Sequence, residues 1–60
     1  MTRARARIET RKRTWRNQIN AARAARLAGE SHRFHRFMKL AHETHQRVLW
    51  DLLIAYIDEA

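Results

Sequence analysis

Hydrophobic side chains, with one histidine among them, recur every three or four residues through the second half of the chain. The repeating positions are Phe34, Phe37, Met38, Ala41, His45, Val48, Leu49, Leu52, Ala55 and Tyr56. At about 100° per residue they form one apolar stripe along a helix. Neither glycine nor proline interrupts residues 32–57. The pattern therefore predicts an amphipathic helix over about residues 32–57.

The first half of the chain predicts another helix with a narrower apolar face. Ile8, Trp15 and Ile19 align along one side, and residues 21–28 consist mainly of strong helix formers. Gly29 can end this helix in a left-handed conformation, and Ser31 can cap the start of the next one. We expect helices over about residues 7–28 and 32–57, joined by a turn at residues 29–31.

These two helices predict an all-α fold in a single domain covering residues 1–60. A short turn between helices favours an antiparallel hairpin. Residues whose numbers sum to about 59 then lie side by side. Trp15 is expected beside His45, which we interpret as a buried, hydrogen-bonded residue, and Leu27 is expected beside Phe34.

The end of the second predicted helix is apolar on nearly all sides. A second apolar surface, away from the stripe, consists of Leu40, Trp50, Leu53, Ile54 and Ile57. A helix that is hydrophobic all round is buried on more than one side, and the narrow first helix cannot cover both surfaces. We therefore expect these residues to form a homodimer interface, giving a four-helix bundle. An interface with a different protein, or a plain monomer, is the alternative.

Positive charge is concentrated in the N-terminal part of the chain. Thirteen Lys and Arg residues face six Asp and Glu residues, a net charge of +7, and Glu9 is the only acidic residue among residues 1–28. The cations of the first sixteen residues are Arg3, Arg5, Arg7, Arg11, Lys12, Arg13 and Arg16. This excess favours an anionic partner, and a guanidinium binds phosphate through two parallel hydrogen bonds. The sequence predicts a regulatory protein that binds DNA or RNA through these seven residues.

Other interpretations of the basic segment stay open. The same arginines could dock an adaptor or inhibitor on an acidic partner protein. Trp15 fits core packing better than base stacking. An Arg-rich and Ala-rich start is also typical of a mitochondrial presequence, although its removal would leave a single helix.

The sequence holds no pattern typical of catalysis. Cysteine is absent, Ser31 is the only serine, and no glycine-rich phosphate loop occurs. His32, His35, His42 and His45 form two pairs whose directions differ by about 140° around a helix, so they cannot converge on one metal ion. We expect no enzyme activity, metal, cofactor or small-molecule substrate. An apolar run this short also predicts no membrane span, and the lack of a secretory signal predicts an intracellular location, in the cytoplasm or the nucleoid or nucleus.

Overall fold

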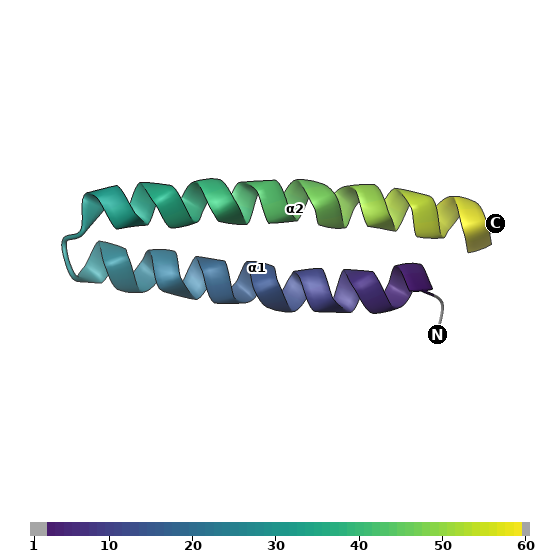
Figure 1. The fold of residues 1–60 in the computed structure, drawn as a ribbon, viewed down its shortest axis with the longest axis horizontal. Coiled ribbons are helices and arrows are strands. Elements are labelled where there is room, and N and C mark those ends of the chain that lie inside the picture. The colour runs from purple at the N-terminus through teal and green to yellow at the C-terminus, as the bar shows by residue number, and fades with distance from the viewer. Residues whose placement is uncertain (1–2, 60) are drawn as a thin grey trace.

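The computed structural model describes residues 3–59, which form two long helices. Helix α1 spans Arg3–Leu27 and helix α2 spans Ser31–Glu59. They run antiparallel and side by side, so that Arg3 and Glu59 lie at the same end of the molecule (Figure 1). The predicted all-helical hairpin is confirmed. Both helices reach further toward this open end than predicted, because α1 begins four residues earlier and α2 ends two residues later.

Gly29 ends α1 as the sequence predicts. Its φ of +74° is a left-handed conformation that strains any residue with a Cβ atom. The Gly29 N–H donates to the Arg26 carbonyl at 3.1 Å, and the Glu30 N–H donates to the Ala25 carbonyl at 2.9 Å. These two bonds make a Schellman motif, which satisfies the last carbonyls of α1 and turns the chain back on itself.

The start of α2 differs from the prediction by one residue. The Phe34 N–H donates to the Glu30 carbonyl at 3.0 Å, so Glu30 rather than Ser31 occupies the capping position. The Glu30 carboxylate also accepts a hydrogen bond from Arg33, at 3.1 Å. This acid therefore lies where the positive end of the α2 dipole is strongest.

The contact between the helices is a narrow seam of mostly small side chains. The seam positions that α1 buries or half-buries are Ala4, Ile8, Arg11, Trp15, Gln18, Ala22 and Ala25, and those of α2 are Phe37, Ala41, Thr44, Val48, Asp51 and Ala55. Their spacing alternates strictly between three and four residues, which is the seven-residue repeat of a coiled coil. Among the large side chains of this seam only Ile8 is fully buried within the described residues, in contact with Ala4 and Ala55.

The seam differs from the apolar stripe that the sequence predicts. Leu49, Leu52 and Tyr56 were expected to face the first helix, but all three are exposed. The seam keeps Val48 and Ala55 of the stripe and passes through Asp51, which the stripe does not contain. The reason is geometric, since a repeat of 3.5 residues selects one line of positions, whereas a stripe averages every apolar position over a wider arc.

Of the two expected contacts between the helices, the structure shows Trp15 beside His45 but not Leu27 beside Phe34. Trp15 and His45 do lie together, with their ring centroids 5.8 Å apart and their planes tilted by 37°. His45 is nevertheless exposed rather than buried, because it follows the seam position Thr44 and lies beside the seam instead of on it. Leu27 is 83% exposed and does not pack on Phe34, because it lies two residues after the seam position Ala25 and therefore on the opposite side of α1.

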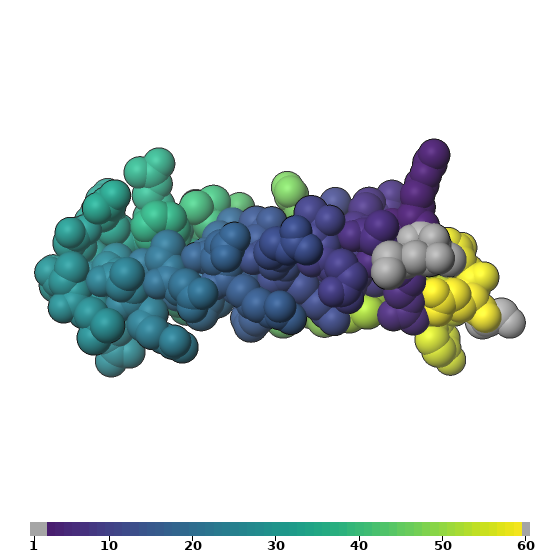
Figure 2. Space-filling view, turned by 90° about the horizontal axis from the view of Figure 1, so that it is seen from below, coloured from purple at the N-terminus to yellow at the C-terminus, as the bar shows by residue number. Residues whose placement is uncertain are grey.

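The hairpin is a rod rather than a sphere. Its principal dimensions are 46 × 16 × 10 Å (Figure 2). The radius of gyration is 13.9 Å, whereas a compact chain of this length has about 10 Å. Within residues 3–59 neither helix is long and apolar enough to cross a membrane. Each helix has a single helical neighbour, so most of both surfaces faces solvent.

Candidate nucleic-acid interface

The seven cations predicted to contact phosphate fall into two groups. Arg5, Arg7, Arg11 and Lys12 form ion pairs with acidic residues of the same chain. Arg3, Arg13 and Arg16 are exposed and form no ion pair within residues 3–59. Arg5, Arg7 and Arg11 pair with acids of α2, and Lys12 pairs with Glu9 within α1. The structure thus divides the basic segment into residues with an acidic partner and residues without one in the described part of the chain.

Arg5 joins the start of α1 to the end of α2. Its Nε donates to Glu59 Oε1 at 3.0 Å, and its Nη2 donates to Glu59 Oε2 at 2.8 Å. This bidentate geometry suits the planar guanidinium. The hydrogen bond from Arg5 lowers the pKa of Glu59 and raises the pKa of Arg5 from their ordinary values. Arg5 is therefore occupied by a carboxylate in the same position that a phosphate would take.

Asp51 is the one charged side chain that the described residues bury, with 5% of its surface exposed. Arg11 Nε lies 2.9 Å from its Oδ2, and Arg7 Nε lies 4.0 Å from its Oδ1. The Arg11 N–H is not directed along a hydrogen bond, so Oδ2 is compensated by charge alone. Sequence reasoning missed this site. The signal was present, because Asp51 and Arg11 both fall on the seven-residue repeat of the seam.

The solvent face of α1 carries the cations that have no ion pair in the described part of the chain. Arg13 and Arg16 lie one turn apart, and Arg23 lies two turns beyond Arg16, about 10 Å along the axis. Exposed Asn17 and Asn20 lie among them and add neutral hydrogen-bond donors. Glu9, the only acid of α1, forms an ion pair with Lys12, whose Nζ lies 3.8 Å from Glu9 Oε1. This solvent face, with Arg3 near its start, therefore carries a dense set of exposed cations.

Arg23 and Arg26 were not among the predicted phosphate contacts. Both are exposed and form no ion pair within the described residues. The prediction concentrated on the density of arginines in the first sixteen residues. The signal for Arg23 is its spacing of seven residues from Arg16, which places both on one side of a helix.

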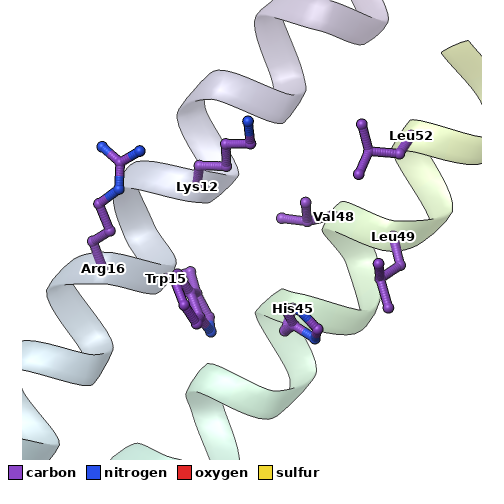
Figure 3. Close-up of a pocket in the computed structure, with 7 residues that line it drawn as sticks. All are labelled: Lys12, Trp15, Arg16, His45, Val48, Leu49 and Leu52. Carbon is purple, nitrogen blue, oxygen red and sulfur yellow. The ribbon is translucent and has the colours of Figure 1, made fainter.

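A groove runs along one side of the seam beside this face. Its volume is about 270 Å³, and it is lined by Lys12, Trp15, Arg16, His45, Val48, Leu49 and Leu52. The Trp15 ring extends from α1 toward His45 of α2, whereas the Arg16 side chain extends away from α2 (Figure 3). Trp15 is half-buried, as core packing predicts. One edge of the groove is cationic and the other is aliphatic. We call this feature the Trp15 groove.

The predicted dimer interface lies on the surface that α1 does not cover. Leu40, Trp50, Leu53 and Ile57 are exposed, and Ile54 is half-buried. Trp50 is 64% exposed, an unusual position for so large an aromatic side chain. The apolar end of α2 is thus uncovered in the single hairpin.

The four histidines do not gather into a metal site. Within residues 3–59 no group of three or more His, Asp or Glu side chains is placed to hold a metal ion.

The sequence matches no protein-family model, and neither a curated protein nor a solved structure is significantly similar to it.

Proposed function

We propose that this protein is a small, non-enzymatic regulatory protein that binds DNA or RNA through the solvent face of α1. The observation that carries the proposal is the set of exposed arginines that form no ion pair within residues 3–59, among them Arg13, Arg16 and Arg23. A helix of 25 residues with one acid attracts polyanions strongly.

The mechanism of binding is electrostatic. Each arginine that neutralises a phosphate releases a condensed counterion, and this release supplies most of the non-specific affinity. Asn17 and Asn20 lie beside the arginines on the same face and can contact phosphates or base edges. Arg5, Arg7 and Arg11 contribute to the long-range field but stay in their ion pairs.

A homodimer with a four-helix arrangement is part of this proposal. The uncovered apolar end of α2 supports it, since such a surface is normally buried in an assembly. Two hairpins bring two cationic faces into one particle, and simultaneous contacts raise the affinity for a long polyanion.

The test compares two variants with equal charge. Arg13→Gln/Arg23→Gln removes two cations from the solvent face of α1, and Arg36→Gln/Arg47→Gln removes two exposed cations from α2. Affinities for duplex DNA and hairpin RNA are measured by gel shift at low salt, with circular dichroism as the folding control. We expect at least a tenfold loss for the α1 variant and a much smaller loss for the α2 variant. Equal losses would refute the α1 face as the binding surface.

The alternative function, an adaptor that docks on an acidic protein, uses the same arginines. Poly-glutamate serves as the probe for it. Nucleic acid binding that is no tighter than poly-glutamate binding at equal charge concentration favours the adaptor.

A further inference from the structure

The hairpin exposes more surface than a compact chain of its size. Its accessible surface is 5045 Å², whereas a compact monomer of 7.2 kDa exposes about 4,100 Å². The difference is roughly 900 Å², and each partner in a standard protein interface buries about 800 Å². One such interface per chain, as a homodimer provides, therefore accounts for the difference.

The seam divides the rest of the hairpin surface into two flanks. Counted by the seven-residue repeat, one flank contains the Trp15 groove, and the other lies beside Arg11 and Asp51. We call the second one the Trp50 flank. Its α2 positions from residue 40 to residue 54 are Leu40, Glu43, Arg47, Trp50 and Ile54. Leu53 lies opposite the seam and belongs to neither flank.

The α1 side of the Trp50 flank is small and uncharged. Its positions from residue 10 to residue 24 are Thr10, Thr14, Asn17, Ala21 and Ala24. The groove flank differs, because its α1 positions include Lys12, Arg16 and Arg23, and its acids, Glu9 and Glu59, already have ion-pair partners. A second copy docked on the groove flank would therefore cover cations that this flank's acids are not free to pair. The Trp50 flank instead lets another helix approach closely.

Two hollows lie along the Trp50 flank. The hollow nearer the turn has a volume of about 360 Å³, and Ala21, Ala24 and Phe37 are among the side chains that line it. The hollow nearer the open end has a volume of about 410 Å³, and Arg47 and Trp50 form part of its wall. Both hollows are open in the single hairpin, so side chains of a second copy can enter them.

The charged residues at the middle of this flank have no partner in the described chain. Glu43 and Arg47 are exposed, and neither forms an ion pair within residues 3–59. They lie on either side of residue 45, which is the midpoint of α2. Leu40 and Trp50 lie on the same flank at equal distances from this midpoint. The order of leucine, glutamate, arginine and tryptophan along the flank is therefore centred on residue 45.

A two-fold axis at residue 45 makes the flank complementary to itself. Two antiparallel α2 helices that overlap fully bring residues level whose numbers sum to 90, as 31 and 59 do. Glu43 then lies level with Arg47 of the partner subunit, and Leu40 lies level with Trp50 of the partner subunit. The axis generates each contact twice. Opposite charges and apolar side chains are thus matched along the middle of the flank.

The same register fills both hollows. Leu40 and Ile54 are the apolar flank positions next to the seam, so in a four-helix bundle they point between the helices. Ile54 of the partner subunit comes level with residue 36, beside the hollow nearer the turn. Leu40 of the partner subunit comes level with Trp50, beside the hollow nearer the open end.

The other two-fold arrangement of these flanks leaves the charges unmatched. With both turns at one end, α2 lies on α1 of the second copy, and residues of α1 and α2 whose numbers sum to about 62 are level, as Arg11 and Asp51 are. Glu43 then faces the uncharged stretch between Asn17 and Ala21 of the partner subunit. Charge complementarity therefore favours the arrangement with the turns at opposite ends.

We propose that the Trp50 flank binds the same flank of a second copy, with the two α2 helices antiparallel and Glu43 paired to Arg47 of the partner subunit. The proposal rests on the dimer of the proposed function and assigns its flank, direction and register. The two α1 helices also come side by side, on one side of the bundle. Their solvent faces, each with Arg13 and Arg16, then form a single cationic surface.

The decisive experiment uses two charge variants of the full chain, Glu43→Lys and Arg47→Glu. In each variant alone the proposed contact joins like charges, whereas in a mixed dimer both contacts join opposite charges. We expect the unaltered protein to sediment at twice 7.2 kDa. Each variant alone should dimerise at least about tenfold more weakly, and an equimolar mixture should recover the unaltered dimer affinity.

The matched control makes the same charge changes on the groove flank. Glu9→Lys and Arg16→Glu should each dimerise like the unaltered protein, alone and mixed. Circular dichroism checks that every variant is helical, and recovery on mixing tests the contact between chains even if one variant alone is poorly folded.

The direction of the dimer is measured with a spin label at Ser31→Cys. Ser31 is exposed at the start of α2, and the unaltered chain contains no cysteine. With the turns at opposite ends, the distance between the two labels approaches the 46 Å length of the rod. A distance of less than half that length places both turns at one end and overturns the proposed direction.

The dimer and nucleic-acid binding fail separately. Sedimentation is measured without nucleic acid, so a failure of DNA or RNA binding leaves the dimer result standing. Because Arg47→Gln removes one side of the proposed contact, the Arg36→Gln/Arg47→Gln control for nucleic-acid binding is compared at a protein concentration at which it is still dimeric. A failure of the dimer leaves the Arg13→Gln/Arg23→Gln comparison standing.

Three further results would overturn the proposal. The first is a protein that stays monomeric up to millimolar concentration, including one that instead binds vesicles of anionic lipid. The second is no recovery when the two charge variants are mixed. The third is a dimer that survives Trp50→Ser/Ile54→Ser but is lost in Leu49→Ser/Leu52→Ser, because that pattern assigns the interface to the groove flank.

Discussion

Arg11 Nε lies 2.9 Å from Asp51 Oδ2, and Asp51 is 5% exposed. This ion pair sits on the seam between the two helices, so Arg11 compensates a carboxylate that has almost no access to water. A buried charge that loses its partner destabilises the folded state strongly. Arg11 is therefore a structural residue within a segment whose composition suggests phosphate binding.

The first prediction concerns the stability of this pair. Arg11→Gln should lower the free energy of unfolding by about 1–3 kcal/mol, a value reduced from that of a fully buried pair because the Arg11 side chain is 34% exposed. Arg13 lies two residues further along, on the solvent face of α1, and forms no ion pair within residues 3–59. Arg13→Gln should therefore change the free energy of unfolding by less than about 0.5 kcal/mol. Urea unfolding followed by circular dichroism measures both values. Equal effects of the two substitutions contradict the role assigned to Arg11.

The double variant Arg11→Met/Asp51→Leu refines this prediction. Replacing both members of a buried ion pair by apolar residues of similar size is often neutral or stabilising. We expect the double variant to recover most of the stability that Arg11→Gln loses. A double variant as unstable as the single one shows that the seam needs the charges themselves.

The second prediction concerns the turn. Gly29→Ala should cost about 1 kcal/mol of stability, because a φ of +74° disfavours an L-residue. An added Cβ meets no atom within 4 Å, so the cost comes from the backbone alone. A chain synthesised with D-alanine at position 29 should be at least as stable as the unaltered one, since a D-residue prefers positive φ. Thermal unfolding of the two synthetic chains separates backbone strain from steric contact.

The third prediction concerns pH. Because the pKa of Glu59 is lowered in the folded state by its hydrogen bond with Arg5, the pair stabilises the fold at neutral pH. The contribution is complete above the ordinary glutamate value of about 4.3 and is lost as pH falls through the lower pKa of the folded state. NMR titration of the Glu59 carboxyl should show its midpoint rise in Arg5→Gln. An unchanged midpoint in that variant contradicts the bidentate pair.

The fourth prediction concerns salt. On duplex DNA the slope of log affinity against log salt concentration should be less steep by about 2 in Arg13→Gln/Arg23→Gln, since each lost phosphate contact removes about 0.9. The α2 control, Arg36→Gln/Arg47→Gln, should keep the unaltered slope. Fluorescence anisotropy at four salt concentrations is sufficient. A changed slope in the control would place phosphate contacts on α2.

Local sequence features predict the two helices and the direction of their packing. Gly29 can take a positive φ where other residues are strained, and the absence of glycine and proline from residues 32–57 lets α2 continue without a break. Both features act within a few residues along the chain. The hairpin could therefore be predicted, with helix ends in error by up to four residues.

The seam and the use of each arginine depend on register, which is set between the helices. An apolar stripe cannot show that Asp51 is buried while Leu49 is exposed. A rotation of α2 about its axis by less than the angle between consecutive residues would bury Leu49 and expose Asp51. The sequence identifies the cations, yet only the residues opposite each of them decide which are occupied. Arg11 and Arg13 look alike in the sequence and have different roles in the structure.

The outward position of Leu27 has a practical consequence. The chain contains no cysteine, so Leu27→Cys introduces a single thiol at a site that is 83% exposed. The rod is 46 Å long, and this thiol lies at the turn, opposite the end where Arg5 meets Glu59. A fluorophore or spin label attached there would report on tumbling, oligomer size and ligand capture from a part of the molecule that neither proposed surface uses.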